Sequence, residues 1–148
     1  MLATKDLNCY VCGPDNPLGL RVPYRRDGKK GSIACYKARA EHGGWSGILH
    51  GGVTFALMDE AFGWALYYQQ LPAVTARVEA KFHEPIKVGT SVIVKAWVVK
   101  ERRRLFELHA EVRAETDGTL LADADATMYR IGATSPSHVL EVHNNAAE

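Results

Sequence analysis

Two adjacent acidic residues, Asp59 and Glu60, interrupt the most apolar stretch of the chain, residues 53–68. A carboxylate among apolar side chains is costly unless it is paired or used. If the stretch is helical, adjacent side chains point about 100° apart, so the two acids cannot serve one site equally. We expect Asp59 to be a catalytic carboxylate, since Gly63 leaves space one turn away. The alternatives are a structural Asp59 paired with an arginine, and Glu60 as the working acid. Glu60 is otherwise expected to make an interface or surface contact, and it is included with Gly52 among the expected substrate-binding residues.

The tripeptide His50-Gly51-Gly52 directly precedes this stretch. The first N–H groups of a helix have no helical partner, and the positive end of the helix dipole lies there. Glycine also lets a ligand approach the backbone closely. We therefore expect Gly51 to stabilise developing negative charge and Gly52 to contact the substrate. His50 is expected to orient the glycine loop, with general-base catalysis or simple packing as alternatives.

One long helix is predicted to position these residues, over residues 51–71, with Pro72 marking its end. Its apolar residues surround the axis, so the helix must be buried. Asp27-Gly28 predicts a hairpin turn between strands at residues 20–24 and 31–41. Further strands are predicted at residues 74–83, 91–99, 105–114 and 120–128.

Alternation of apolar and polar residues supports these later strands. In the first of them one predicted face is apolar and is turned to the core: Val74, Ala76, Val78, Ala80 and Phe82. Thr75 lies in the same strand and is expected either to donate a hydrogen bond to the catalytic carboxylate or water, or to be an ordinary strand threonine. Residues 91–99 are nearly continuously apolar, so we expect that strand to be covered on both sides. The prediction is an α+β fold, with an antiparallel sheet of about five to six strands wrapped around a long central helix.

Composition excludes several other classes of protein. The chain has 148 residues, of which 47% are hydrophobic and 24% charged, and its net charge is +1. These values are typical of a globular domain and carry no basic excess for nucleic acid. We expect a single domain over residues 1–131, a polar C-terminal tail over residues 132–148, no membrane span and no leader segment. Three cysteines, an odd number, favour reduced thiols and a cytoplasmic location.

Cys9 and Cys12 form a CxxC pair, which is half of a zinc site. No second such pair follows in the sequence, although Cys35 and His42 could supply further ligands in space. We expect two reduced thiols in a turn, and no metal or cofactor.

The layout of the elements, the segment from Cys9 to Leu20 (CYVCGPDNPLGL), and the run from Gly47 through His50 to Asp59 and Glu60 together resemble the hotdog-fold thioesterases. The similarity is to the PaaI-like branch of the 4-hydroxybenzoyl-CoA thioesterase superfamily. An acid nine residues after the histidine, inside a helix, is a fairly specific feature. The similarity extends over residues 9–131.

This resemblance implies hydrolysis of acyl-CoA thioesters by a homodimer or homotetramer. It also implies that Gly51 supplies the backbone amide facing the thioester carbonyl, that Asp59 is the family acid, and that Thr75 is a helpful hydroxyl. Gly44 departs from the family, because many members carry Asn or Gln six residues before the histidine. Two other functions are weighed against hydrolysis: a non-catalytic acyl-CoA binding module, and a hotdog dehydratase or hydratase acting on acyl thioesters.

Overall fold

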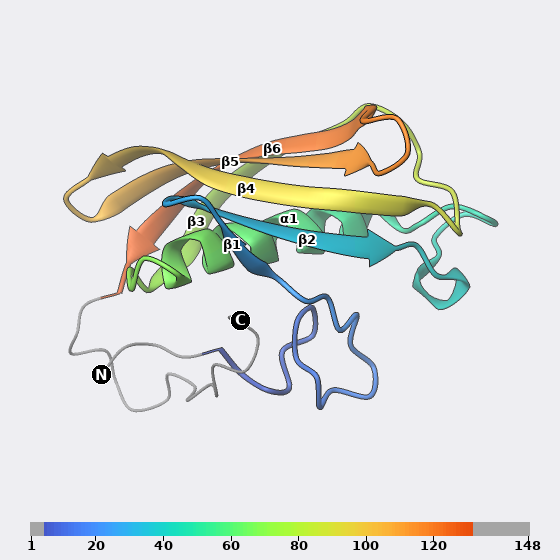
Figure 1. Ribbon diagram of the computed structural model, residues 1–148, viewed down its shortest axis with the longest axis horizontal. Coiled ribbons are helices and arrows are strands. Elements are labelled where there is room, and N and C mark those ends of the chain that lie inside the picture. Colours follow the sequence, from blue (N-terminus) through green and yellow to red (C-terminus); the bar gives the residue numbers. More distant parts are fainter. Residues whose placement is uncertain (1–4, 132–148) are drawn as a thin grey trace.

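A computed structural model describes residues 5–131, and it contains one long helix and six strands (Figure 1). A short 3-10 helix, Ala40–His42, precedes the long helix. The elements in chain order are β1 (Arg25–Asp27), β2 (Gly31–Lys37), α1 (Gly51–Tyr67), β3 (Ala73–Phe82), β4 (Ser91–Arg102), β5 (Leu105–Ala114) and β6 (Leu120–Arg130).

The six strands form one antiparallel sheet in the order β1-β2-β4-β5-β6-β3. Helix α1 lies against one face of this sheet, and the segment before β1 covers the other side of the helix (Figure 1). The predicted architecture of a long helix wrapped by an antiparallel sheet is therefore confirmed, with six strands. Both β1 and β3 are edge strands, so the longer one, β3, has a full backbone edge without a partner strand in residues 5–131.

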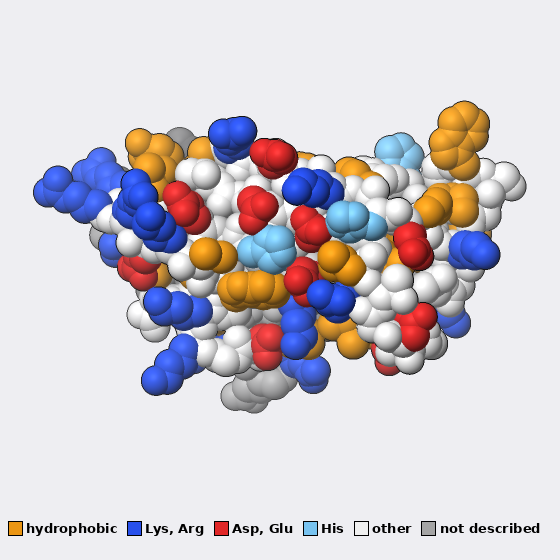
Figure 2. All heavy atoms as spheres, turned by 90° about the horizontal axis from the view of Figure 1, so that it is seen from above, with side chains coloured by type: hydrophobic (Ala, Val, Ile, Leu, Met, Phe, Trp, Pro, Cys, Tyr) orange, Lys and Arg blue, Asp and Glu red, His pale blue; other side chains and the backbone are white. Residues whose placement is uncertain are grey.

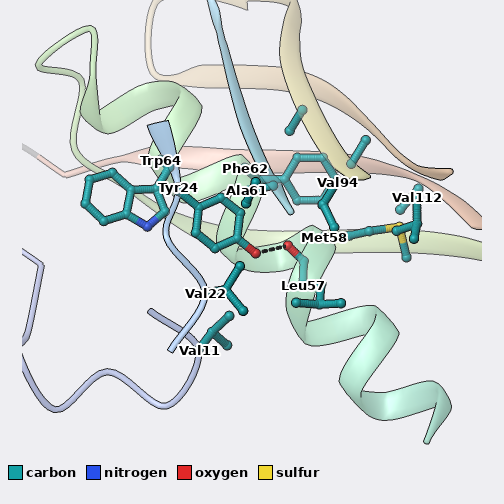
Figure 3. Packing of buried hydrophobic residues seen from close by; sticks show 14 of the residues in the cluster. Val11, Val22, Tyr24, Leu57, Met58, Ala61, Phe62, Trp64, Val94 and Val112 are labelled. Carbon is teal, nitrogen blue, oxygen red and sulfur yellow. Dashed lines mark hydrogen bonds between the residues drawn. The ribbon is translucent and has the colours of Figure 1, made fainter. Parts of the chain in front are cut away.

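The core forms on both sides of α1. Figure 3 shows Met58 and Phe62 directed toward Val94 and Val112 of the sheet. On the other side of the helix, the segment before β1 packs its own apolar residues, Val11, Val22 and Tyr24, against α1. The Tyr24 hydroxyl donates to the carbonyl oxygen of Leu57 at 2.7 Å. A helix that is apolar all round is thus buried between two layers, as its sequence requires.

Some predicted boundaries are wrong by a few residues. Helix α1 ends at Tyr67 rather than at residue 71, and a turn with Gln70 in the left-handed region (φ 58°) precedes Pro72. The first strand begins at Arg25, after the predicted residues 20–24, and β2 ends at Lys37 instead of residue 41. The predicted turn at Asp27-Gly28 is present, and Gly28 has a φ of 65° that suits glycine.

Within one chain, residues 91–99 are covered on one side only, not on both sides as expected. Alternate residues of β4 are buried under α1, but the other face carries half-buried Ile93 and Trp97 and exposed Lys95. Figure 2 views the outer face of the sheet, which is covered with charged side chains and histidines rather than a second layer. The apolar residues on this face made the sequence of the strand look fully buried. In the structure they are surrounded by long polar side chains instead.

Strand β3 departs from the predicted alternation because of a β-bulge at Ala76. Thr75 is opposite buried Met128, whereas Arg77 is opposite Thr127, so the register shifts between them. Val74 is opposite Tyr129 and is 53% exposed, on the outer face. The prediction that Val74 shares the inner face with Val78 is therefore wrong. A bulge reverses the side on which residues before it lie, and here it turns Thr75 toward α1.

None of the helices within residues 5–131 is long and apolar enough to span a membrane. The predicted tail, residues 132–148, lies outside the described residues.

Candidate active site

Helix α1 begins with His50 as its N-cap residue. The His50 side chain accepts a hydrogen bond at Nδ1 from the Gly52 N–H at 2.8 Å. In the neutral ring this leaves the proton on Nε2, so neither nitrogen is free to act as a base in this arrangement. A Cβ on Gly52 would lie 3.0 Å from His50 Nδ1, so a side chain there would force the His50 ring to shift. The histidine therefore holds the glycine loop in place.

The Gly51 N–H differs from that of Gly52. The N–H groups of Val53 and Thr54 both donate to the His50 carbonyl oxygen, and the Gly52 N–H donates to the His50 ring. The Gly51 N–H has no acceptor within residues 5–131, and Gly51 is exposed. An exposed, unpaired N–H at the positive end of a helix is an anion-binding group.

An open hollow of about 540 Å³ adjoins Gly51; its lining residues are Gly43, Gly44, Trp45, Leu49, His50 and Gly51. Trp45 is 86% exposed and belongs to this lining. Phe82, at the end of β3, is 55% exposed, and its ring would lie 4.0 Å from a Cβ on Gly51. The surroundings of Gly51 thus combine a polar donor with exposed aromatic surface.

Asp59 lies further along α1, on the side that faces β3. Its Oδ1 accepts a hydrogen bond from the Thr75 hydroxyl at 2.8 Å. The bulge at Ala76 makes this contact possible because it turns Thr75 inward. Asp59 is half-buried and forms no ion pair with any group in residues 5–131, so the alternative of an arginine partner finds no support there. Its second carboxylate oxygen has no partner among these residues.

Gly51 and Asp59 do not converge within one chain. Eight residues separate them on one helix, which corresponds to about 12 Å along the helix axis. An aspartate side chain cannot span that distance. The structure therefore brings Asp59 and Thr75 together at one place and His50, Gly51 and Gly52 together at another.

Glu60 lies on a different side of α1 and has a cationic partner. Its Oε1 is 2.5 Å from Nζ of Lys5, and both side chains are largely buried, with exposed fractions of 12% and 20%. Burial by itself lowers the pKa of Lys5, but the charge of Glu60 and its hydrogen bond outweigh burial and leave that pKa raised. Glu60 is therefore engaged in an ion pair, away from the partners of Asp59.

The donors best placed to hold a metal ion in residues 5–131 are the two thiols of the CxxC pair and Glu60. Their ligand atoms lie within 4.8 Å of one another. Cys35 and His42, considered above as further ligands, do not join this group. The Cys35 thiol is hydrogen-bonded to Glu115, and the His42 ring is hydrogen-bonded to the Tyr36 hydroxyl.

Three neighbours of the site were not predicted from the sequence. Trp45 is a lone aromatic residue in a glycine-rich loop, which could have indicated an exposed contact. Phe82 was expected in the core because of strict alternation. Lys5 pairs with Glu60 across 55 residues of sequence, and no local pattern signals such a contact.

Comparison with known proteins adds family information to this geometry. Residues 46–121 match the family model described as "Thioesterase superfamily". This segment includes His50, Gly51, Asp59 and Thr75, so it contains both parts of the candidate site.

Among curated proteins, the chain is similar to human acyl-coenzyme A thioesterase 13. The two are 28% identical over 102 residues, which is 67% of this chain and 73% of the human protein.

Solved structures share the fold. A mutant of the phenylacetic acid degradation protein PaaI from Thermus thermophilus superposes with a TM-score of 0.69 at 28% identity, over 76% of this chain and 95% of that one. A further thioesterase superfamily protein superposes with a TM-score of 0.77 at 20% identity. That match covers 82% of this chain and 60% of the other, so the chain spans about three fifths of that protein's length.

Proposed function

Because the chain belongs to the thioesterase superfamily and is a thioester hydrolase, we propose that it hydrolyses acyl-CoA to a free acid and coenzyme A. The observation that carries this proposal is the unpaired N–H of Gly51, a residue that lines the hollow at the N-terminus of α1. The similarity to human acyl-coenzyme A thioesterase 13 supports coenzyme A as the thiol part of the substrate.

In this proposal the Gly51 N–H donates to the thioester oxygen, which becomes an oxyanion when the carbonyl carbon is attacked. Preformed donors of this kind stabilise the transition state most when water is excluded. Gly52 has a different role, because its own N–H donates a hydrogen bond to His50 Nδ1. Its missing side chain leaves the His50 ring in place and the approach of the substrate open.

Asp59 is proposed as the general base or nucleophile. Thr75 donates to Oδ1 and fixes the carboxylate, while Oδ2 stays available for water or the thioester carbon. As a base, Asp59 takes a proton from water while the water oxygen attacks the carbonyl carbon. Collapse of the tetrahedral intermediate then breaks the C–S bond, and the coenzyme A thiolate leaves and is protonated.

We further propose that the working site is shared by two copies of the chain, as a homodimer or a homotetramer. The separation of about 12 Å between Gly51 and Asp59 on one helix means that one thioester cannot contact both in a single chain. Strand β3 carries Thr75 and has an unpaired edge in residues 5–131, and such an edge favours pairing with another strand. A dimer or larger assembly is expected by light scattering, and a monomer at assay concentration would contradict this part.

Glu60 is not assigned a contact with substrate in this scheme, because its carboxylate is paired with Lys5. The cytoplasmic location stays part of the proposal and rests on three free cysteines, Cys9, Cys12 and Cys35, which suit a reducing compartment.

The test is a panel of acyl-CoA substrates with release of free thiol as the readout. It is paired with two variants at Gly51. Gly51→Pro removes the N–H group, and proline is tolerated at the first helical position after an extended residue; His50 has ψ 131°. Gly51→Ala keeps the N–H, and its Cβ meets only the Phe82 ring at 4.0 Å.

We expect release of coenzyme A from at least one acyl chain, a loss in kcat of about 10²–10³-fold in Gly51→Pro, and a small change in Gly51→Ala. Binding of acyl-CoA without any thiol release would instead favour the acyl-CoA binding module. Equal kcat values for the two variants would contradict the role of the Gly51 amide.

A further inference from the structure

Four reactive or charged side chains meet where the N-terminal segment packs against α1, outside the proposed active site. They are Lys5, Cys9, Cys12 and Glu60, and only Glu60 belongs to the helix. The proposed hydrolysis uses none of these groups. Their grouping is built by the fold, because Glu60 is 55 residues from Lys5.

The turn that carries the two cysteines is tightly constrained. The Gly13 N–H donates to the Cys9 carbonyl oxygen at 2.9 Å. A Cβ on Gly13 would lie 2.4 Å from both the Cys9 nitrogen and the Leu7 oxygen, so no other residue fits there without a backbone shift. The Cys12 N–H donates to the Cys9 sulfur at 3.5 Å. The two sulfur atoms lie within 4.8 Å of one another.

The charge of Glu60 is already neutralised by a cation. This favours a dithiol pair over a metal site formed by the two cysteines and Glu60. The Lys5 ammonium is 2.5 Å from Glu60 Oε1 and 5.3 Å from the centre of the Trp64 ring. A metal ion bound by Cys9, Cys12 and Glu60 would lie beside this ammonium, whose positive charge repels that of the ion. The arrangement in the structure instead leaves the two sulfurs as neighbours beside a satisfied ion pair.

The two thiols are electrostatically different. The neighbouring Cys12 side chain, followed by backbone N–H groups, lowers the pKa of Cys9. The pKa of Cys12 is raised, first by its hydrogen bond to Cys9 and then by burial and Glu60. A thiolate is the attacking species in disulfide exchange, so Cys9 suits the first step and Cys12 suits the second.

We propose that Cys9 and Cys12 are a redox-active dithiol that closes to a disulfide by exchange with a low-molecular-weight disulfide. The Cys9 thiolate attacks one sulfur of the oxidant, whose S–S bond breaks and releases one thiolate. Cys12 then loses its proton and attacks the Cys9 sulfur of the mixed disulfide, which releases the second thiolate. The cysteine pair is oxidised by two electrons and the oxidant is reduced to two thiols.

The experiment uses the full chain with Cys35→Ser, so that only the pair can react, and oxidised glutathione as the probe. Free thiols are counted by alkylation and mass spectrometry. We expect a complete intramolecular disulfide that reduced glutathione reverses. Cys12→Ser in the same background should accumulate the mixed disulfide of Cys9 with glutathione, because no second thiol is left to resolve it.

Three results would overturn the proposal. The first is a pair that stays reduced in oxidised glutathione while denatured protein is oxidised. The second is a Cys12→Ser protein in which Cys9 forms no mixed disulfide with glutathione. The third is stoichiometric zinc in the purified protein that blocks oxidation until a chelator is added. The measurement with Cys9 and Cys12 both present requires no substitution in the turn, so it stands even if a single variant fails to fold.

Discussion

Asp59 and Glu60 are neighbours in the chain, yet the two sides of α1 give them opposite surroundings. Asp59 faces β3, where a neutral hydroxyl from Thr75 donates to one oxygen and the other has no partner in residues 5–131. Glu60 faces the N-terminal segment, where the Lys5 ammonium binds it at 2.5 Å and the side chain is 12% exposed. One carboxylate is oriented but open, and the other is neutralised.

This difference shows how the elements packed against a helix determine what an acid on it can do. A hydroxyl fixes the position of a carboxylate without supplying a charge, so the carboxylate can still accept a proton or attack. An ammonium instead binds the carboxylate directly and neutralises its charge, so that carboxylate is not available to a substrate. We therefore expect substitutions on the β3 side to change turnover, and substitutions on the other side to change stability.

The largest expected effect is that of Asp59→Asn. Removal of a general base lowers kcat by on the order of 10²-fold or more. The melting temperature should change little, because Asn keeps the shape of Asp59, accepts from Thr75 and removes a charge from a half-buried position. Steady-state kinetics with the best acyl-CoA of the panel, together with a thermal melt, measure both quantities. A full kcat in this variant would remove Asp59 from the mechanism.

A smaller effect is expected at Thr75, which acts through Asp59 and is a positioning residue. Thr75→Val keeps the β-branched shape and loses the hydroxyl, so kcat should fall by roughly 10-fold, as expected for a hydrogen bond to a charged group. Thr75→Ser retains the hydroxyl and is the matched control. In the double variant with Asp59→Asn the Val substitution should cost little more, because both changes act on one group. Additive losses would separate Thr75 from Asp59.

The smallest effect on turnover is expected for Glu60→Gln, with kcat within about 3-fold of the unsubstituted protein, since Glu60 touches no reacting group. Its effect on stability should be larger than that of Asp59→Asn. The Lys5 ammonium loses its counter-charge while it stays largely buried, which costs roughly 1–3 kcal/mol after allowance for its partial exposure. Urea unfolding measures this loss, and Lys5→Met together with Glu60→Gln should recover part of it. If Glu60→Gln abolishes turnover and Asp59→Asn does not, the two carboxylates have been assigned the wrong way round.

The sequence predicted the arrangement of the helix and the sheet better than the contacts between side chains. The apolar run around Asp59 required a buried helix, and alternation in the later strands required a sheet to cover it; both are confirmed, as is the hotdog-fold thioesterase family. Thr75 turns toward α1 because of a bulge at Ala76. Apolar and polar residues alternate through the bulge without a break, so the sequence gives no sign of the shift in register.

Contacts between distant segments were equally hidden. The pairing of Lys5 with Glu60 leaves no trace in either local sequence. His50 as an N-cap could not be foreseen either, because histidine is not among the residues that favour this position.

The central claim is that the Gly51 amide of one copy and Asp59 of another act on the same thioester. Subunit mixing tests it most directly. Asp59→Asn protein and Gly51→Pro protein are each expected to be nearly inactive, and they are combined by co-refolding, with the mixed assemblies verified by native mass spectrometry. A mixed dimer then contains one site with both functional groups and one site with neither. The account predicts recovery of about a quarter of the unsubstituted activity in a statistical mixture of dimers. Confirmed mixed dimers that stay inactive would contradict it, since that result places both groups of each site in a single chain.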